Sequence, residues 1–282
     1  MKSRTKLFCR VAAVTCSALI LVSAVAGVSF SGNNITLDKS VSAAAGYPVD
    51  AQSTESWSGY VAENHKFNTV QAEITVPTVT CTTQNSNLLV WVGFDGFNEK
   101  IAQPTTEQVG VGADCGKVGS KPNYYTWWEM NPTNNMVKID KSVVDIKAGD
   151  KIWTTVTYNG SPNYYYTLRV RNVRTNQAKN INIGCGKYQN KQLVCRRGTA
   201  EFIAERKLVS SGYTALAKWS SDPYMFTNAK AAFGTSRTLK PLDYFTPTPL
   251  NMLSYKTGNT LAKVTSIASN GTTFTSTYKN SK

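Results

Sequence analysis

Histidine is almost absent from this sequence, since His65 is the only one among 282 residues. A Ser-His-Asp triad would depend on that one residue, and a metal site built from several histidines is excluded. His65 stands in the loop-like segment Glu63–Lys66, where a surface position is commoner than a catalytic one. No glycine-rich phosphate loop or dinucleotide fingerprint is present either. We therefore expect no cofactor and no bound metal.

Acidic residues are also scarce: 17 Asp and Glu stand against 31 Lys and Arg, for a formal net charge of +14. The basic residues are scattered singly and form no run or aromatic-basic motif, so nucleic acid is not an expected partner. Their charge could hold the protein near an anionic cell wall, or simply cover a solvated surface. General acid–base chemistry, if present, depends mainly on the few carboxylates.

Long hydrophobic runs are missing except near the N-terminus. Basic residues at Lys2, Arg4, Lys6 and Arg10 precede an apolar run from Val11 to Val28, which contains the small-residue site Ala24–Ala26. This arrangement predicts a signal peptide over residues 1–26, with an uncleaved membrane anchor as the alternative. Residues 27–55 are predicted to be a linker or short pro-segment, and residues 56–282 a single domain. We expect a secreted monomer with no membrane association after cleavage.

Cysteines are few, and no C-x-x-C pair suggests a zinc site. Four remain beyond the predicted signal peptide: Cys81, Cys115, Cys185 and Cys195. An even number in an exported chain predicts two disulfides. Cys81 and Cys115 are equidistant from position 98 in a turn-like segment, and Cys185 and Cys195 from position 190. If the flanking segments form hairpins, the pairs are Cys81–Cys115 and Cys185–Cys195.

Helical periodicity is lacking, and short runs rich in β-branched and aromatic residues recur between Gly, Pro, Asn and Asp. The predicted strands are Val70–Val76, Leu88–Asp95, Tyr124–Glu129, Val137–Ile139, Val143–Ile146, Lys151–Tyr158, Tyr164–Val173, Ala200–Glu205 and Tyr213–Trp219. Several alternate with period two, as half-buried antiparallel strands do. The pattern predicts an all-β sandwich or barrel.

Some carboxylates stand inside these apolar strand patterns rather than in turns. Asp95 and Glu129 end two of the strands, and Glu201 and Glu205 bracket a third. Because residues two apart share a face of a strand, Glu201 points the same way as Glu205. By the same rule Trp91 shares a face with Asp95, and Trp127 with Glu129. Carboxylates set among tryptophans can hold a polymer and have raised pKa values; salt-bridged strand acids are the alternative.

The same segments resemble a known family. They are Ser56–Gly59 (SWSG), Trp91–Gly96 (WVGFDG), Glu107–Gly110 (EQVG), Trp127–Pro132 (WWEMNP), Ile146–Ile152 (IKAGDKI) and Ala200–Glu205 (AEFIAE). In this order they resemble motifs of the eqolisins, the glutamic endopeptidases, and we identify the chain as a bacterial-type member. The resemblance implies a β-sandwich of two large curved antiparallel sheets, a concanavalin-like jelly roll. It implies a secreted acid endopeptidase acting on polypeptides.

The resemblance assigns roles to individual residues of this sequence, at the positions that match functional residues of the eqolisins. Glu205 matches the catalytic glutamate and Gln108 the catalytic glutamine, while Glu201 matches a structural glutamate. The residues that match the substrate-binding cleft are Trp57, Trp91, Asp95, Trp127 and Glu129. The implied mechanism is attack by a water that ionised Glu205 activates, with no covalent intermediate. One departure is Gly112, which stands where fungal members carry an aspartate; another is the basic net charge.

Two other functions remain open at this stage. Jelly-roll glycoside hydrolases also place two glutamates among aromatic residues on a concave face, and Glu129 and Glu205 could form that pair. A non-catalytic wall- or glycan-binding β-sandwich is the other. The context of Gln108 and the AEFIAE strand favour the peptidase.

Overall fold

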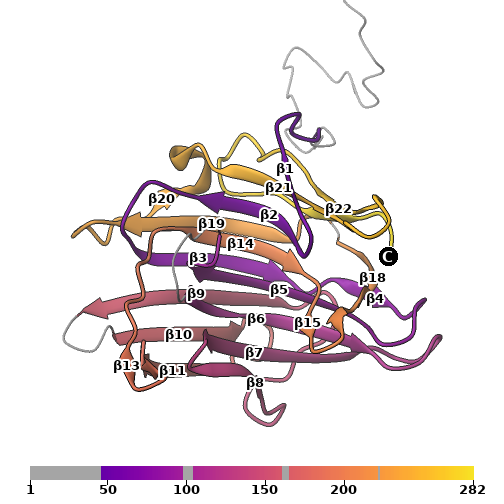
Figure 1. The fold of residues 1–282 in the computed structure, drawn as a ribbon, viewed down its shortest axis with the longest axis horizontal. Coiled ribbons are helices and arrows are strands. Elements are labelled where there is room, and N and C mark those ends of the chain that lie inside the picture. Colours follow the sequence, from indigo (N-terminus) through magenta and orange to yellow (C-terminus); the bar gives the residue numbers. More distant parts are fainter. Residues whose placement is uncertain (1–45, 98–103, 161–164, 222) are drawn as a thin grey trace, which may run out of the picture. The chain divides into compact units, whose positions relative to one another are not determined.

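A computed structural model describes residues 46–97, 104–160, 165–221 and 223–282, all within the compact unit Ala44–Lys282. These residues form two large, mainly antiparallel sheets packed as a β-sandwich, as the sequence predicts (Figure 1). The predicted signal peptide and most of the predicted linker lie outside the described residues. Among the residues that the structure describes, no helix combines the length and hydropathy needed to traverse a membrane.

The larger sheet contains eleven strands of the described chain. Its main path runs β23 (Ser276–Tyr278), β22 (Thr260–Val264), β21 (Thr248–Leu253), β2 (Trp57–Ala62), β14 (Ala200–Glu205), β5 (Ser86–Phe94), β6 (Thr106–Cys115), β7 (Asn123–Asn131) and β8 (Asn134–Ile139). Two short strands join in parallel, β1 (Gln52–Thr54) on β21 and β17 (Ala215–Leu216) on β5. Strands far apart in sequence, such as β2 and β14, are thus direct neighbours.

The second sheet contains six described strands. In order they are β11 (Ala178–Gly184), β10 (Tyr165–Asn172), β9 (Lys151–Gly160), β3 (Phe67–Thr75), β19 (Phe226–Phe233) and β20 (Lys240–Pro241). Short pairs and one 3-10 helix complete the described elements: β4 (Thr78–Thr80) with β18 (Lys218–Ser220), β12 (Lys187–Tyr188) with β13 (Lys191–Gln192), β15 (Leu208–Val209) with β16 (Gly212–Tyr213), and η1 (Leu242–Phe245).

The larger sheet is apolar on both faces at its centre. Every residue of β5 is buried, although only alternate side chains can face the second sheet. Leu88, Val90 and Val92 belong to the main core between the sheets, whereas Leu89 and Trp91 belong to a separate, smaller cluster. That smaller cluster lies on the other face and is the floor of the candidate site.

Most predicted strands are present, with two errors. The predicted strand Tyr213–Trp219 is divided among the short strands β16, β17 and β18, each of which pairs with a different strand. Val143–Ile146 is not a strand but a turn and an irregular segment. The backbone nitrogens of Val143 and Val144 donate to the Asp140 carbonyl at 2.9 and 3.1 Å, and Ser142 donates to its carboxylate. Val144 and Ile146 are nevertheless buried in the main core, which accounts for their strand-like composition.

Both predicted disulfides are present, but the hairpin symmetry behind them is only approximate. Cys81 bonds to Cys115 and Cys185 to Cys195. Within the β5–β6 hairpin Cys115 is opposite Ser86, so Cys81 reaches it from the loop that follows β4. The predicted Cys81–Cys115 bond is nevertheless correct, because both of these cysteines lie at the same end of the β5–β6 hairpin.

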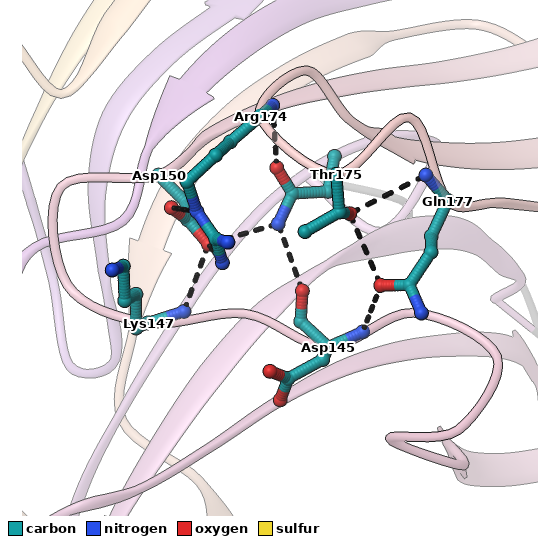
Figure 2. A network of polar contacts seen from close by, with 7 residues as sticks. Asp145, Lys147, Asp150, Arg174, Thr175 and Gln177 are labelled. Carbon is teal, nitrogen blue, oxygen red and sulfur yellow. Dashed lines mark hydrogen bonds and ion pairs between the residues drawn. The ribbon is translucent and has the colours of Figure 1, made fainter.

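A buried carboxylate holds the turn that precedes β9 (Figure 2). Asp150 is 4% exposed and accepts hydrogen bonds from the Arg174 guanidinium, the Asn172 amide and the Lys147 backbone. Burial opposes ionisation of Asp150, but these hydrogen bonds outweigh it and hold the pKa of the carboxyl below its ordinary value. The charge therefore persists in acidic solution.

Replacing Asp150 with alanine should lower the free energy of unfolding by about 2–3 kcal/mol at pH 6, because buried donors lose a charged acceptor. Since the folded-state pKa is depressed, this stabilisation is present above the ordinary pKa of about 3.9 and is lost as pH falls below it. The difference between wild type and variant should therefore shrink towards pH 2. Urea unfolding at several pH values measures it; a difference that is constant with pH would contradict the assignment.

Candidate active site

The candidate site is built on the face of the larger sheet that turns away from the second sheet. In β14, Ala200, Phe202 and Ala204 join the main core, whereas Ile203 belongs to the smaller cluster. Alternation places Glu201 and Glu205 on the same face as Ile203, as the sequence predicts. The strands β14, β5, β6 and β7 are consecutive neighbours (Figure 1), so their side chains on this face form continuous rows.

Two rows carry the polar groups of interest. In the first, Glu201 pairs with Gly93, Gly93 with Gln108, and Gln108 with Glu129. In the row four residues further along β14, Glu205 pairs with Leu89, Leu89 with Gly112 and Gly112 with Tyr125. The row between them contains the pairs Ile203–Trp91, Trp91–Gly110 and Gly110–Trp127. Tryptophans therefore separate Glu205 from Gln108 along the sheet.

Glu205 ends β14 and is half-buried. The Trp91 indole Nε1 donates a hydrogen bond to Glu205 Oε2 at 2.7 Å. Burial raises the pKa of Glu205 to about 7, opposed by hydrogen bonds from Trp91 and Trp57 and increased by the charge of Glu129. Such a carboxyl group gains and loses protons near neutral pH, which suits proton transfer.

Gln108 is buried to 7% exposure, and its Nε2 donates to Glu129 Oε2 at 2.6 Å. Burial raises the pKa of Glu129, while the hydrogen bonds from Gln108 and from the Met136 backbone oppose the shift. The carboxylate fixes which way the Gln108 amide points, because only the NH2 end can donate. The second Nε2 hydrogen can then be presented to a substrate.

The three predicted tryptophans differ in exposure. Trp57 is half-buried and contacts Trp91 edge to face, with ring centroids 5.1 Å apart. Trp91 and Trp127 are fully buried, and Trp127 Nε1 donates to the Val111 carbonyl at 2.9 Å. The buried indoles form the floor of the site, and of the three only Trp57 retains accessible surface.

Asp95 is placed differently from the other predicted site residues. It is fully buried, with a φ of 64°, and its carboxylate accepts the backbone N–H groups of Arg197 and Gly198, both at 2.6 Å. Burial raises the pKa of Asp95, and these backbone hydrogen bonds oppose the shift. This carboxylate holds the loop that precedes β14. The structure therefore does not bring it together with Glu205 and Gln108.

A polar cluster that sequence reasoning missed lies beside Glu205. Asp114 accepts hydrogen bonds from Lys207 at 2.6 Å, from Lys138 at 2.7 Å and from the Tyr125 hydroxyl at 2.9 Å. Strand alternation from Gln108 to Asp114 and from Glu205 to Lys207 could have placed two of these on the site face. Lys138 comes from β8, whose pairing with β7 was not predictable from its sequence alone.

No group of three or more His, Cys, Asp or Glu side chains among the described residues is arranged to hold a metal ion. The site contains one carboxyl group with a pKa of about 7, that of Glu205. It also contains the oriented amide donor of Gln108 and a floor of buried aromatic side chains.

Comparison of the sequence with known families finds a match to one of them. The sequence model of the peptidase A4 family, the eqolisins, covers residues 55–278. The chain belongs to the peptidase A4 family. A search of curated protein sequences found no significant match.

Solved structures place this A4 peptidase among eqolisin folds. Scytalido-glutamic peptidase with a transition state analog inhibitor aligns with a TM-score of 0.62 at 21% identity, covering 80% of this chain and 98% of that one. SCP-B, an eqolisin in complex with the tripeptide Ala-Ile-His, aligns with a TM-score of 0.58 over the same shares at 21% identity. At these sequence identities the structural similarity supports only the fold. The assignment to the peptidase A4 family rests on the match to the family's sequence model.

Proposed function

We propose that this A4 peptidase is an acid endopeptidase in which Glu205 transfers protons and Gln108 stabilises the developing oxyanion. The observation that carries this proposal is the carboxyl group of Glu205, bonded to the Trp91 indole, on the same sheet face as an amide oriented by Glu129. Burial supports the proton-transfer role, because it raises the pKa of Glu205 to about 7. The charge of Glu129 itself contributes to raising that pKa, so the two halves of the site are electrostatically coupled.

The sequence-based hypothesis starts from ionised Glu205, but the raised pKa favours the opposite starting form in acid. At pH 4 a carboxyl group with a pKa of about 7 is ionised in only about one molecule in a thousand. Protonated Glu205 would donate its proton to the scissile carbonyl oxygen while water adds to the carbonyl carbon. The resulting carboxylate would then take a proton from the added water, which regenerates the acid.

Collapse of the tetrahedral intermediate uses the same group. Glu205 donates its proton to the peptide nitrogen, the C–N bond breaks, and a hydroxyl proton of the intermediate returns to the carboxylate. Water addition runs ahead of proton transfer to the former carbonyl oxygen, so partial negative charge develops there in the transition state, and a Gln108 Nε2 hydrogen would donate to that oxygen throughout. Because the amide does not titrate, it serves equally across the acidic range. No covalent intermediate forms.

Substrate binding is assigned to the tryptophan-lined face. Trp57, with its accessible indole, would contact an extended polypeptide, and Trp91 and Trp127 would support it from below. Glu129 would act through Gln108, and the placement of Asp95 gives it a loop-holding role. We propose no metal or other cofactor.

We also propose that the protein is secreted as a monomer. The two disulfides are typical of an oxidising compartment. Exposed Arg169 and Arg171 on the outer face of β10, together with the excess of basic over acidic residues, would favour association with an anionic cell wall. We propose no nucleic-acid partner, because the basic residues form no run or aromatic-basic motif.

An assay of denatured protein and of a plain polysaccharide, each from pH 3 to 9, tests the proposal. Peptides should appear from the protein and no sugars from the polysaccharide. If protonated Glu205 is the starting form, kcat/KM should fall about tenfold per pH unit above about pH 7. A rate that rises up to pH 7 would instead support the ionised form as the base.

The same assay separates the other functions that the sequence left open. Sugars released without peptides would replace the peptidase by a glycoside hydrolase that uses Glu129 and Glu205. Binding of the polysaccharide with no cleavage of either substrate would indicate a glycan-binding module.

A further inference from the structure

Two lysines converge on one carboxylate at the edge of the site face. Lys207 Nζ lies 2.6 Å from Asp114 Oδ1, and Lys138 Nζ lies 2.7 Å from Asp114 Oδ2. The Tyr125 hydroxyl donates to Asp114 Oδ1 at 2.9 Å, and the Lys138 ammonium lies 3.8 Å from the Tyr125 ring centroid. Residues from β6, β7 and β8 and from just after β14 thus meet at one point.

The absence of a side chain at Gly112 makes this arrangement possible. A Cβ atom at Gly112 would lie 2.5 to 2.7 Å from two ring carbons and the hydroxyl oxygen of Tyr125, closer than van der Waals contact permits. The ring therefore lies directly over Gly112, and this position lets its hydroxyl reach Asp114. The cluster is built into the sheet rather than formed by chance between mobile surface side chains.

The cluster carries an excess of positive charge. Burial opposes ionisation of Asp114, but the hydrogen bonds from Lys138, Lys207 and Tyr125 outweigh it and hold its pKa below the ordinary value. Burial lowers the pKa of Lys207, opposed by the interaction with Asp114. In acidic solution two ammonium groups therefore face one carboxylate. The Lys138 side chain remains 44% exposed, so its charge is open to a ligand.

The cluster is close to the proposed reacting centre. Lys207 follows Glu205 by two residues, and Tyr125 belongs to the same register row as Glu205 through Leu89 and Gly112. Adjacent rows on one face of a sheet are about 7 Å apart, and an extended peptide advances about 3.4 Å per residue. A substrate residue within a few positions of the scissile bond could therefore reach the two ammonium groups.

We propose that Lys138 and Lys207 form a specificity subsite that binds an acidic side chain of the peptide substrate, with Asp114 and Tyr125 as the positioning residues that hold the lysines apart and in place. The inference rests on the proposed peptidase function and adds a substrate class to it. Each ammonium group has donors left after its bond to Asp114, so an incoming carboxylate can be bound without breaking the cluster.

The test uses peptides that differ at one position only, with Glu or its neutral isostere Gln scanned through the positions on either side of the scissile bond. At one position the wild-type enzyme should cleave the Glu peptide with a kcat/KM about five- to tenfold higher than the Gln peptide, as for a single partly buried ion pair. Above about 0.5 M salt this ratio should fall, because screening weakens exposed pairs.

Three variants are compared with wild type by the ratio of kcat/KM for the Glu peptide to kcat/KM for the Gln peptide. Lys138→Gln should bring the ratio close to one, because the more exposed ammonium is lost. Asp114→Asn should raise the ratio, since the cluster gains net positive charge. Lys179→Gln, an exposed lysine on β11 of the other sheet, should leave it unchanged. Circular dichroism confirms that each variant is folded.

The possible results separate the subsite from the peptidase function. Equal cleavage of all Glu and Gln peptides by active wild-type enzyme would overturn the subsite and leave the proposed function standing. A preference that persists in Lys138→Gln and does not rise in Asp114→Asn would also overturn it. Cleavage of no peptide at any pH would contradict the proposed function itself.

Discussion

Replacing Glu205 with glutamine is expected to lower kcat by about 10²–10⁴-fold, the usual contribution of a positioned acid–base group. Glutamine keeps the volume of the side chain and an oxygen that can accept the Trp91 indole hydrogen bond, so the fold should persist. What is lost is the transferable proton. The measurement is kcat and KM for one peptide over pH 3 to 9, with Glu73→Gln on the second sheet as the matched control.

The same variant should differ from wild type in stability. In wild type, a folded-state pKa of about 7 against an ordinary value of 4.5 means that the folded protein binds the extra proton between these pH values. Wild type should therefore lose about 3 kcal/mol between pH 4 and pH 8 relative to Glu205→Gln. Near-wild-type proteolysis by folded Glu205→Gln would defeat the proposed mechanism and make Glu129 the next candidate.

Replacing Gln108 with alanine is expected to lower kcat by about 10²–10³-fold with a smaller change in KM. The amide would act on the charge that develops in the transition state rather than on the bound substrate, so its loss should appear mainly in kcat. Because Glu129 then loses the hydrogen bond that opposes its raised pKa, any residual activity should also show an altered pH profile.

A matched control for Gln108→Ala is Gln192→Ala, which removes an exposed glutamine from β13. It should retain wild-type kcat and pH dependence. If Gln108→Ala raised KM with kcat unchanged, Gln108 would be a substrate-binding residue and the oxyanion assignment would be wrong.

Most strands near the site could be predicted because each has a strong local pattern. Ala200–Glu205 alternates cleanly, and the structure has a strand with those bounds. Val143–Ile146 has a similar composition but forms no strand, because Asp140 accepts backbone hydrogen bonds that a ladder would need. Strands such as β19 and β21 were not predicted; β21 contains Pro249 and gains its place through pairing with β2.

The residues of the candidate site were predictable to different degrees. Glu205 and Gln108 stand in motifs whose order along the chain is visible in the sequence. The burial of Asp95 was not visible, since its partners Arg197 and Gly198 lie about a hundred positions away. Nor did the sequence predict that Glu129 orients Gln108, because this contact needs β6 and β7 to pair with those two residues opposite each other.

The sequence by itself determined the β class, the presence of two disulfides, the family motifs and the face of each strand on which a carboxylate lies. These properties follow from chain-local chemistry: side-chain period, cysteine count and the order of short motifs. Only the tertiary structure decided the pKa of Glu205, the orientation of Gln108 and the convergence of Lys138, Lys207 and Asp114. Burial and charge coupling depend on distances between strands that are remote in sequence, and the sheet order alone sets those distances.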